Sequence, residues 1–131
     1  MAKLIQQRVV LPVPPDKLFD MYLDPKEHAA FTGGEVLISP EPGSEFRAFN
    51  GMLSGRMLVV VPKRMIVQTW RSIHFGPDDL DSILTLTFRN DPAGGRIDLA
   101  HVNVADQDAE QVNEGWEKFY WTPWRRYLEQ R

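Results

Sequence analysis

The sequence contains no cysteine, and this absence excludes a disulfide framework and a thiolate metal site. Its three histidines, His28, His74 and His101, are isolated from one another. None belongs to an HExxH motif, and none has a second ligand two or four residues away. Isolated histidines are typical of surface positions or of hydrogen-bonded core positions. We therefore predict no bound metal and no cofactor.

Long apolar runs are also missing. No segment approaches the ~18 apolar residues that a membrane-spanning helix needs. The N-terminus, Met-Ala-Lys-Leu-Ile-Gln-Gln-Arg, has no apolar stretch of the kind found in signal peptides. We therefore expect no membrane span, and a cytoplasmic location is the default prediction.

An excess of basic residues is missing too. The chain has 15 Lys and Arg against 18 Asp and Glu, a net charge of −3, so we expect no binding of nucleic acid, which needs a broad positive field. Its 131 residues match the length of one domain, and no repeat or linker divides them. We predict a single domain over residues 1–131, as a monomer or a homodimer.

Recognisable catalytic motifs are absent as well. No serine lies in a GxSxG sequence, and the glycine pairs at 33–34 and 94–95 lack the patterns of nucleotide-binding loops. The carboxylate pairs Asp78–Asp79 and Asp106/Asp108 fall in predicted turns, where a solvated loop fits better than an acid–base dyad. These observations favour a protein that is not an enzyme.

A two-residue hydrophobic period dominates the middle of the chain and indicates β-strands. The predicted strands are 3–11, 35–39, 44–49, 53–61, 65–74, 82–90 and 96–104. The connections between the later strands are too short for crossover helices, so the sheet must be antiparallel. Asn50-Gly51 predicts a tight hairpin, and Gly55 within a strand predicts a bulge or bend.

Helical signals flank these strands. Pro14-Pro15-Asp16 predicts the start of one short helix, and Asp24 with Glu27 forms a capping box for a second that ends near Thr32. The longest helix is predicted over 108–129, capped by Asp108 and disturbed by Pro123, where we expect a kink or a break. One of its faces carries an apolar, mostly aromatic stripe, which a large surface must cover: Val112, Trp116, Phe119, Tyr120, Pro123 and Tyr127.

The order of these elements predicts an α+β helix-grip fold. A curved antiparallel sheet of about six or seven strands would wrap around the long C-terminal helix, with two short helices after the first strand. A sheet wrapped around one helix packs poorly and tends to leave a cavity. The aromatic residues then have two interpretations, either as ordinary core or as the lining of a pocket. The candidate lining residues are Trp70, Phe49, Phe88, Trp116, Tyr120 and Trp124.

Several motifs resemble one known family. These are Ala30-Phe31-Thr32-Gly33, the segment 46–55, Ile66-Val-Gln-Thr-Trp70-Arg71, the segment 84–88 and Gly115-Trp116 through Tyr120, in that order over about residues 10–128. The sequence is similar to the family of the activator of Hsp90 ATPase, and most similar to the C-terminal domain of that co-chaperone. The resemblance implies a START/Bet v 1-like helix-grip fold with an internal hydrophobic cavity.

Three functions follow as hypotheses. The first is a binding module for a small hydrophobic or amphipathic ligand, and the second is a partner-binding domain that acts on an Hsp90-like chaperone. The third is a cyclase-like enzyme. The eukaryotic co-chaperone has a separate N-terminal domain that contributes much of its Hsp90 contact, whereas this sequence begins at the grip domain. We therefore expect ligand binding ahead of full chaperone activation.

Overall fold

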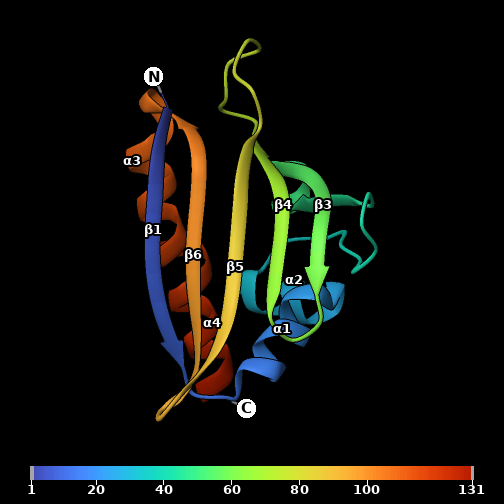
Figure 1. The fold of residues 1–131 in the computed structure, drawn as a ribbon, viewed down its shortest axis with the longest axis vertical. Helices are drawn as coiled ribbons and strands as arrows, with labels where there is room; N and C mark the ends of the chain where they lie inside the picture. Colours follow the sequence, from blue (N-terminus) through green and yellow to red (C-terminus); the bar gives the residue numbers. More distant parts are fainter. Residues whose placement is uncertain (1, 131) are drawn as a thin grey trace.

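The computed structural model describes residues 2–130 and contains a six-stranded antiparallel sheet with helices on one face (Figure 1). The strands lie side by side in the order β1-β6-β5-β4-β3-β2. In chain order the elements are β1 (Ala2–Leu11), α1 (Pro15–Leu23), α2 (Pro25–Thr32), β2 (Glu45–Ala48), the short 3-10 helix η1 (Phe49–Gly51), β3 (Leu53–Val61), β4 (Met65–Ser72), β5 (Ser82–Asp91), β6 (Gly94–Ala105), α3 (Asp106–Gly115), the π-helical segment η2 (Trp116–Trp121) and α4 (Thr122–Glu129).

The C-terminal helix lies behind β1, β6 and β5 in Figure 1, and α1 and α2 lie behind the other end of the sheet. Side chains alternate across the strands, so that in β4 Ile66, Gln68 and Trp70 are buried while their neighbours are more exposed. This alternation places one sheet face against the helices. The predicted helix-grip fold is therefore confirmed.

Local signals in the sequence explain the two short helices. Pro15 occupies the first turn of α1, where a missing N–H is tolerated. The Asp24 carboxylate accepts hydrogen bonds from the backbone N–H groups of Lys26 and Glu27, at 2.9 and 3.4 Å, and so caps α2. Gly33, with φ of 84°, ends that helix, as the sequence predicts.

Residues 35–39 do not form the predicted strand. Among the described residues they make one isolated bridge, between Leu37 and Arg47. The backbone of Glu35 instead pairs with Asn50, whose Oδ1 accepts from the Glu35 N–H at 2.9 Å and whose N–H donates to the Glu35 carbonyl at 3.3 Å. These bonds hold the segment beside η1 and leave it outside the sheet.

Two turn predictions also need correction. Strands β2 and β3 close at the pair Ala48 and Leu53, so the connection is longer than a two-residue hairpin, and Phe49 and Asn50 adopt positive φ values of 50° and 58°. The bulge of β3 lies between Met57 and Val59 rather than at Gly55. A Cβ on Gly55 would collide with the Thr69 carbonyl, so this glycine permits close approach of two strands.

The long helix is continuous from Asp106 to Glu129. It begins two residues before the predicted start, and Asp108 is not its cap, because the N-cap position belongs to Ala105. The helix does not break at Pro123. The irregularity is the π-helical segment η2 directly before it, where the Thr122 N–H donates to the Glu117 carbonyl. A π-helical turn of this kind can accommodate a local interruption of the helical hydrogen bonds.

Candidate functional site: an aromatic cavity between sheet and helix

A cavity of about 410 Å³ lies between the C-terminal helix and the end of the sheet formed by η1, the start of β3 and the end of β4. Met52, His74 and Phe119 are exposed among its lining residues and mark the mouth. The lining consists of Phe49, Met52, Leu53, Trp70, Ser72, His74, Phe75, Asp108, Gln111, Val112, Glu114, Gly115, Trp116, Lys118, Phe119 and Tyr120. The chain therefore forms a mainly apolar chamber under the curved sheet.

Four of the six predicted lining residues, Phe49, Trp70, Trp116 and Tyr120, meet at this cavity. Their rings form a continuous wall, with centroids 6.2 Å apart between Trp70 and Trp116 and 4.7 Å apart between Trp116 and Tyr120. The Phe49 ring meets Tyr120 edge-on at 5.8 Å. These separations lie in the favourable range for aromatic pairs.

The other two predicted residues, Phe88 and Trp124, lie outside the cavity. Phe88 packs edge-on against Phe19 of α1, with centroids 5.5 Å apart. Trp124 stacks on Phe31 of α2 at 4.1 Å and is fully buried. Both are core residues at the end of the molecule covered by the short helices.

Trp70 and Arg71 point to opposite sides of β4, as expected for neighbours in a strand. The Trp70 side chain is buried against the helix. The Arg71 guanidinium donates to the carbonyls of Asp79 and Gly76, both at 2.7 Å, and to the Asp81 carboxylate at 3.2 Å. Arg71 therefore braces the loop between β4 and β5 and lies outside the cavity lining.

Trp116 is anchored by a buried chain of hydrogen bonds. Its indole N–H donates to His101 Nδ1 at 3.2 Å. Because an indole nitrogen is only a donor, Nδ1 must be the acceptor, so His101 Nε2 carries the hydrogen and donates to Ser82 Oγ at 2.8 Å. Ser82 donates in turn to the Trp70 carbonyl at 2.6 Å. Burial lowers the pKa of His101 to about 3, so the imidazole is neutral.

Tyr120 is anchored in the same way by the second buried histidine. His28 Nδ1 donates to the Tyr22 carbonyl at 2.8 Å, which leaves Nε2 to accept from the Tyr120 hydroxyl at 2.9 Å. Burial lowers the pKa of His28 to about 4, although the bond to the Tyr22 backbone opposes the shift. Burial also raises the pKa of Tyr120. Both cavity aromatics are therefore fixed from behind by neutral, fully hydrogen-bonded histidines.

Two lining residues carry buried polar atoms that have no hydrogen-bond partner among residues 2–130. These atoms are the indole Nε1 of Trp70 and the carboxylate Oδ2 of Asp108. A buried donor or acceptor without a partner is costly. This arrangement could not be predicted from the sequence, because Asp108 has the spacing of a helix cap.

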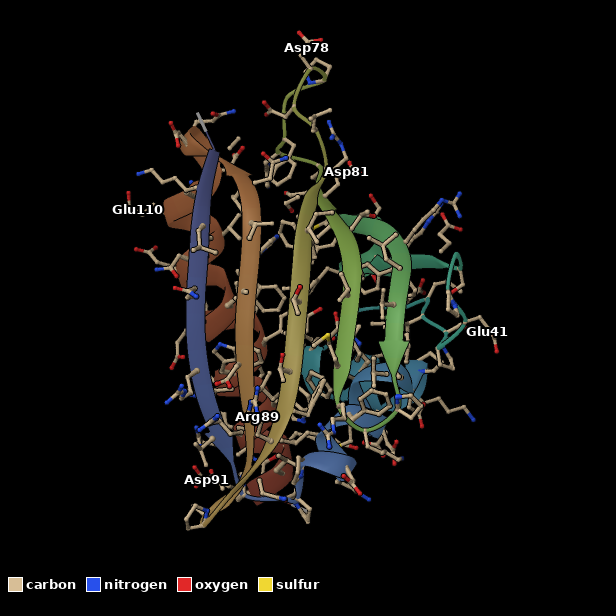
Figure 2. The ribbon with its side chains drawn as sticks, viewed as in Figure 1. Glu41, Asp78, Asp81, Arg89, Asp91 and Glu110 are labelled. Carbon is tan, nitrogen blue, oxygen red and sulfur yellow. The ribbon has the colours of Figure 1, made fainter. Side chains whose placement is uncertain are left out.

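Asp106 and Asp108 lie in the first turn of helix α3, so the prediction of a turn is wrong for this pair. The other acidic pair, Asp78 and Asp79, lies in a loop. Figure 2 shows Asp78 at the tip of the loop between β4 and β5. Asp79, beside it, accepts from the Gly76 N–H at 2.8 Å and from Gln107 Nε2 at 3.1 Å. This pair belongs to a turn, as predicted. Among residues 2–130, no group of three or more histidine and carboxylate side chains is placed to hold a metal.

A sheet that encloses one long helix, with a cavity between them, defines a helix-grip protein. The model of the family described as Activator of Hsp90 ATPase homolog 1-like protein matches residues 12–129. The chain therefore belongs to this family.

Individual relatives agree with this assignment. The human protein named Activator of 90 kDa heat shock protein ATPase homolog 1 is 24% identical over 106 residues, which cover 81% of this chain and 31% of that protein. A Mesorhizobium loti protein of known crystal structure has a TM-score of 0.84 at 21% identity, with 98% of each chain covered. An HSP90 activator from Plasmodium falciparum has a TM-score of 0.82 at 20% identity, covering 98% of this chain and 96% of that one.

The curated relatives are longer proteins, and the chain spans about a third of the human one. No helix within residues 2–130 combines the length and the hydrophobicity required to cross a bilayer.

Proposed function

We propose that this protein is a binding module that holds a small hydrophobic or amphipathic ligand in the cavity beside Trp116. The observation that supports this function is the aromatic wall itself. Trp70, Trp116 and Tyr120 line the cavity, and buried histidines fix Trp116 and Tyr120 in place. A preorganised wall lowers the entropic cost of binding.

The size of the cavity sets the expected affinity. A ligand that buries about 250 Å² of apolar surface would gain roughly 6 kcal/mol at 25 cal/mol per Å². Polar contacts add to this gain, and lost ligand freedom subtracts from it. The dissociation constant should therefore be in the micromolar range.

Gly115 supplies a test that leaves the fold intact. It lines the cavity, and a Cβ at this position would meet only the Phe119 ring, at 3.6 Å. Gly115→Leu should therefore fill part of the cavity, whereas Gly115→Ala is a control with little added volume. Fatty acids, sterols and flat aromatic polyketides would be titrated while tryptophan fluorescence and the melting temperature are followed.

Wild-type protein and Gly115→Ala should respond to at least one of these compounds, and Gly115→Leu should respond weakly. If no compound changes either signal in the wild type, the ligand-binding proposal fails. An equal response in all three proteins would place binding outside the cavity and would also contradict the proposal.

A second candidate function, binding to an Hsp90-type chaperone, is supported by the family itself. Relatives in this family are named as activators of the Hsp90 ATPase, although this chain spans about a third of the human protein. We include the predicted cytoplasmic location in this proposal. Immobilised protein should retain a purified Hsp90 and change its ATPase rate, and the absence of both effects would remove this candidate.

A further inference from the structure

The charged groups around the cavity differ in their burial. Its lining includes Asp108, Glu114 and Lys118. Glu114 and Lys118 are exposed, and the Lys118 ammonium lies 5.3 Å from the centre of the Phe119 ring at the mouth. Asp108 is 7% exposed. The buried charge in the cavity lining is therefore negative.

The environment of Asp108 explains how a carboxylate is tolerated there without a ligand. It lies in the first turn of α3, where the positive end of the helix dipole stabilises an anion. Its Oδ2 nevertheless has no hydrogen-bond partner within the described part of the chain. The Arg71 guanidinium, on the other face of β4, is engaged by Asp81 and by two loop carbonyls. Because Asp108 lines the cavity, a cationic N–H donor on a ligand would compensate the charge of its carboxylate.

The walls of the cavity suit the same kind of ligand. Aromatic faces attract ammonium groups through their quadrupoles, and the attraction is strongest for tryptophan. Trp70 and Trp116 both line the cavity, and Phe119 lies at its mouth.

We propose that the cavity selects organic cations that have a flat apolar body and an ammonium group directed to Asp108. This inference rests on the proposed ligand-binding function and specifies its ligand class. Ligands that end in a carboxylate, such as fatty acids, should bind poorly, because their charge would lie near the unpaired Asp108 oxygen. The predicted order of affinity is cation, then neutral compound, then anion.

Three probes with one ring system test this order: 2-naphthylmethylammonium, 2-naphthylmethanol and 2-naphthoate. Isothermal titration calorimetry at low ionic strength would measure each dissociation constant for the wild type, Asp108→Asn and Glu110→Gln. Glu110 lies on the same helix, is exposed and projects away from the sheet (Figure 2). It is therefore a matched control for the loss of one negative charge.

The wild type should bind the cation about tenfold more tightly than the anion. Asp108→Asn should remove this preference, because it should lower the affinity for the cation and leave the affinity for the neutral probe unchanged. Glu110→Gln should keep the preference for the cation. Equal wild-type affinities for all three probes would overturn the cation proposal and leave the binding function standing. The order of the three affinities is measured on the wild-type protein. It therefore tests the cation proposal even if Asp108→Asn fails to fold. No binding of any probe would count against the binding function itself.

Discussion

Acid should destabilise this protein through its two buried histidines. His28 and His101 are each fully buried and neutral, and burial lowers their pKa values from 6.5 to about 4 and about 3. In the unfolded chain both imidazoles take up a proton as the pH falls through about 6.5. The folded chain takes up these protons only near its lower pKa values. The unfolded state therefore binds more protons between these limits, and stability decreases as the pH falls.

The expected loss can be worked out from these pKa values. Below pH 6.5, each histidine contributes a slope of about 1.4 kcal/mol per pH unit, until the pH reaches the folded pKa. Between pH 7 and pH 5 this amounts to about 2 kcal/mol for each of the two, or about 4 kcal/mol together. Such a loss is a large fraction of the stability of a typical small protein.

Urea denaturation at pH 7, 6 and 5 would measure this loss as a change in the free energy of unfolding. His28→Gln or His101→Gln should each reduce the pH-dependent loss to about 2 kcal/mol, because one titrating group is removed. His74 is exposed, so His74→Gln is the control and should leave the pH dependence unchanged. A loss below about 1 kcal/mol in the wild type would refute the account of two neutral, buried histidines.

Four substitutions test the packing of the helix face and the backbone of β3 and its preceding turn. Trp116→Ala should cost roughly 3–5 kcal/mol in a denaturant melt, and a cost under about 1 kcal/mol would show that this helix face is not core. Gly115→Ala should stabilise the protein by roughly 0.5–1 kcal/mol, because the position is helical and has space for a Cβ; destabilisation would contradict this. Gly55→Ala should abolish folding, because the added Cβ would collide with the Thr69 carbonyl. Gly51 has a φ of 91° but open space around it, so Gly51→Ala should cost only about 1–2 kcal/mol. A thermal melt followed by circular dichroism would measure both effects.

The fold could be predicted because its signals are local and repeated. Alternation along β4 and β5, the cap at Asp24 and the apolar face of the last helix all act over a few residues. The prediction of a strand at 35–39 is wrong because of a contact with a residue outside the segment. Val36 and Ile38 alternate like a strand, but the Glu35 backbone is held by Asn50, fifteen positions away.

The site was predicted only in part, because periodicity identifies a face and not the space in front of it. Trp116 and Trp124 lie on the same broad helix face, yet Trp116 borders the cavity and Trp124 stacks on Phe31. Which of them borders open space depends on where the sheet curves away and where α2 packs. The spacing of Asp108 predicts a helix cap, but the helix begins at Asp106. Asp108 therefore lies within the first turn, and its side chain is buried.

The most direct test of the ligand-binding account is the response of the individual tryptophan indole N–H signals in a ¹H–¹⁵N spectrum. The titrant would be 2-naphthylmethylammonium. The Trp70 signal should shift with saturation, because Trp70 lines the cavity and its N–H has no hydrogen-bond partner among the described residues 2–130. The Trp124 signal should stay in place, because its ring is stacked on Phe31 away from the cavity. Shifts at Trp124 without shifts at Trp70, or no saturable shift at all, would contradict the account.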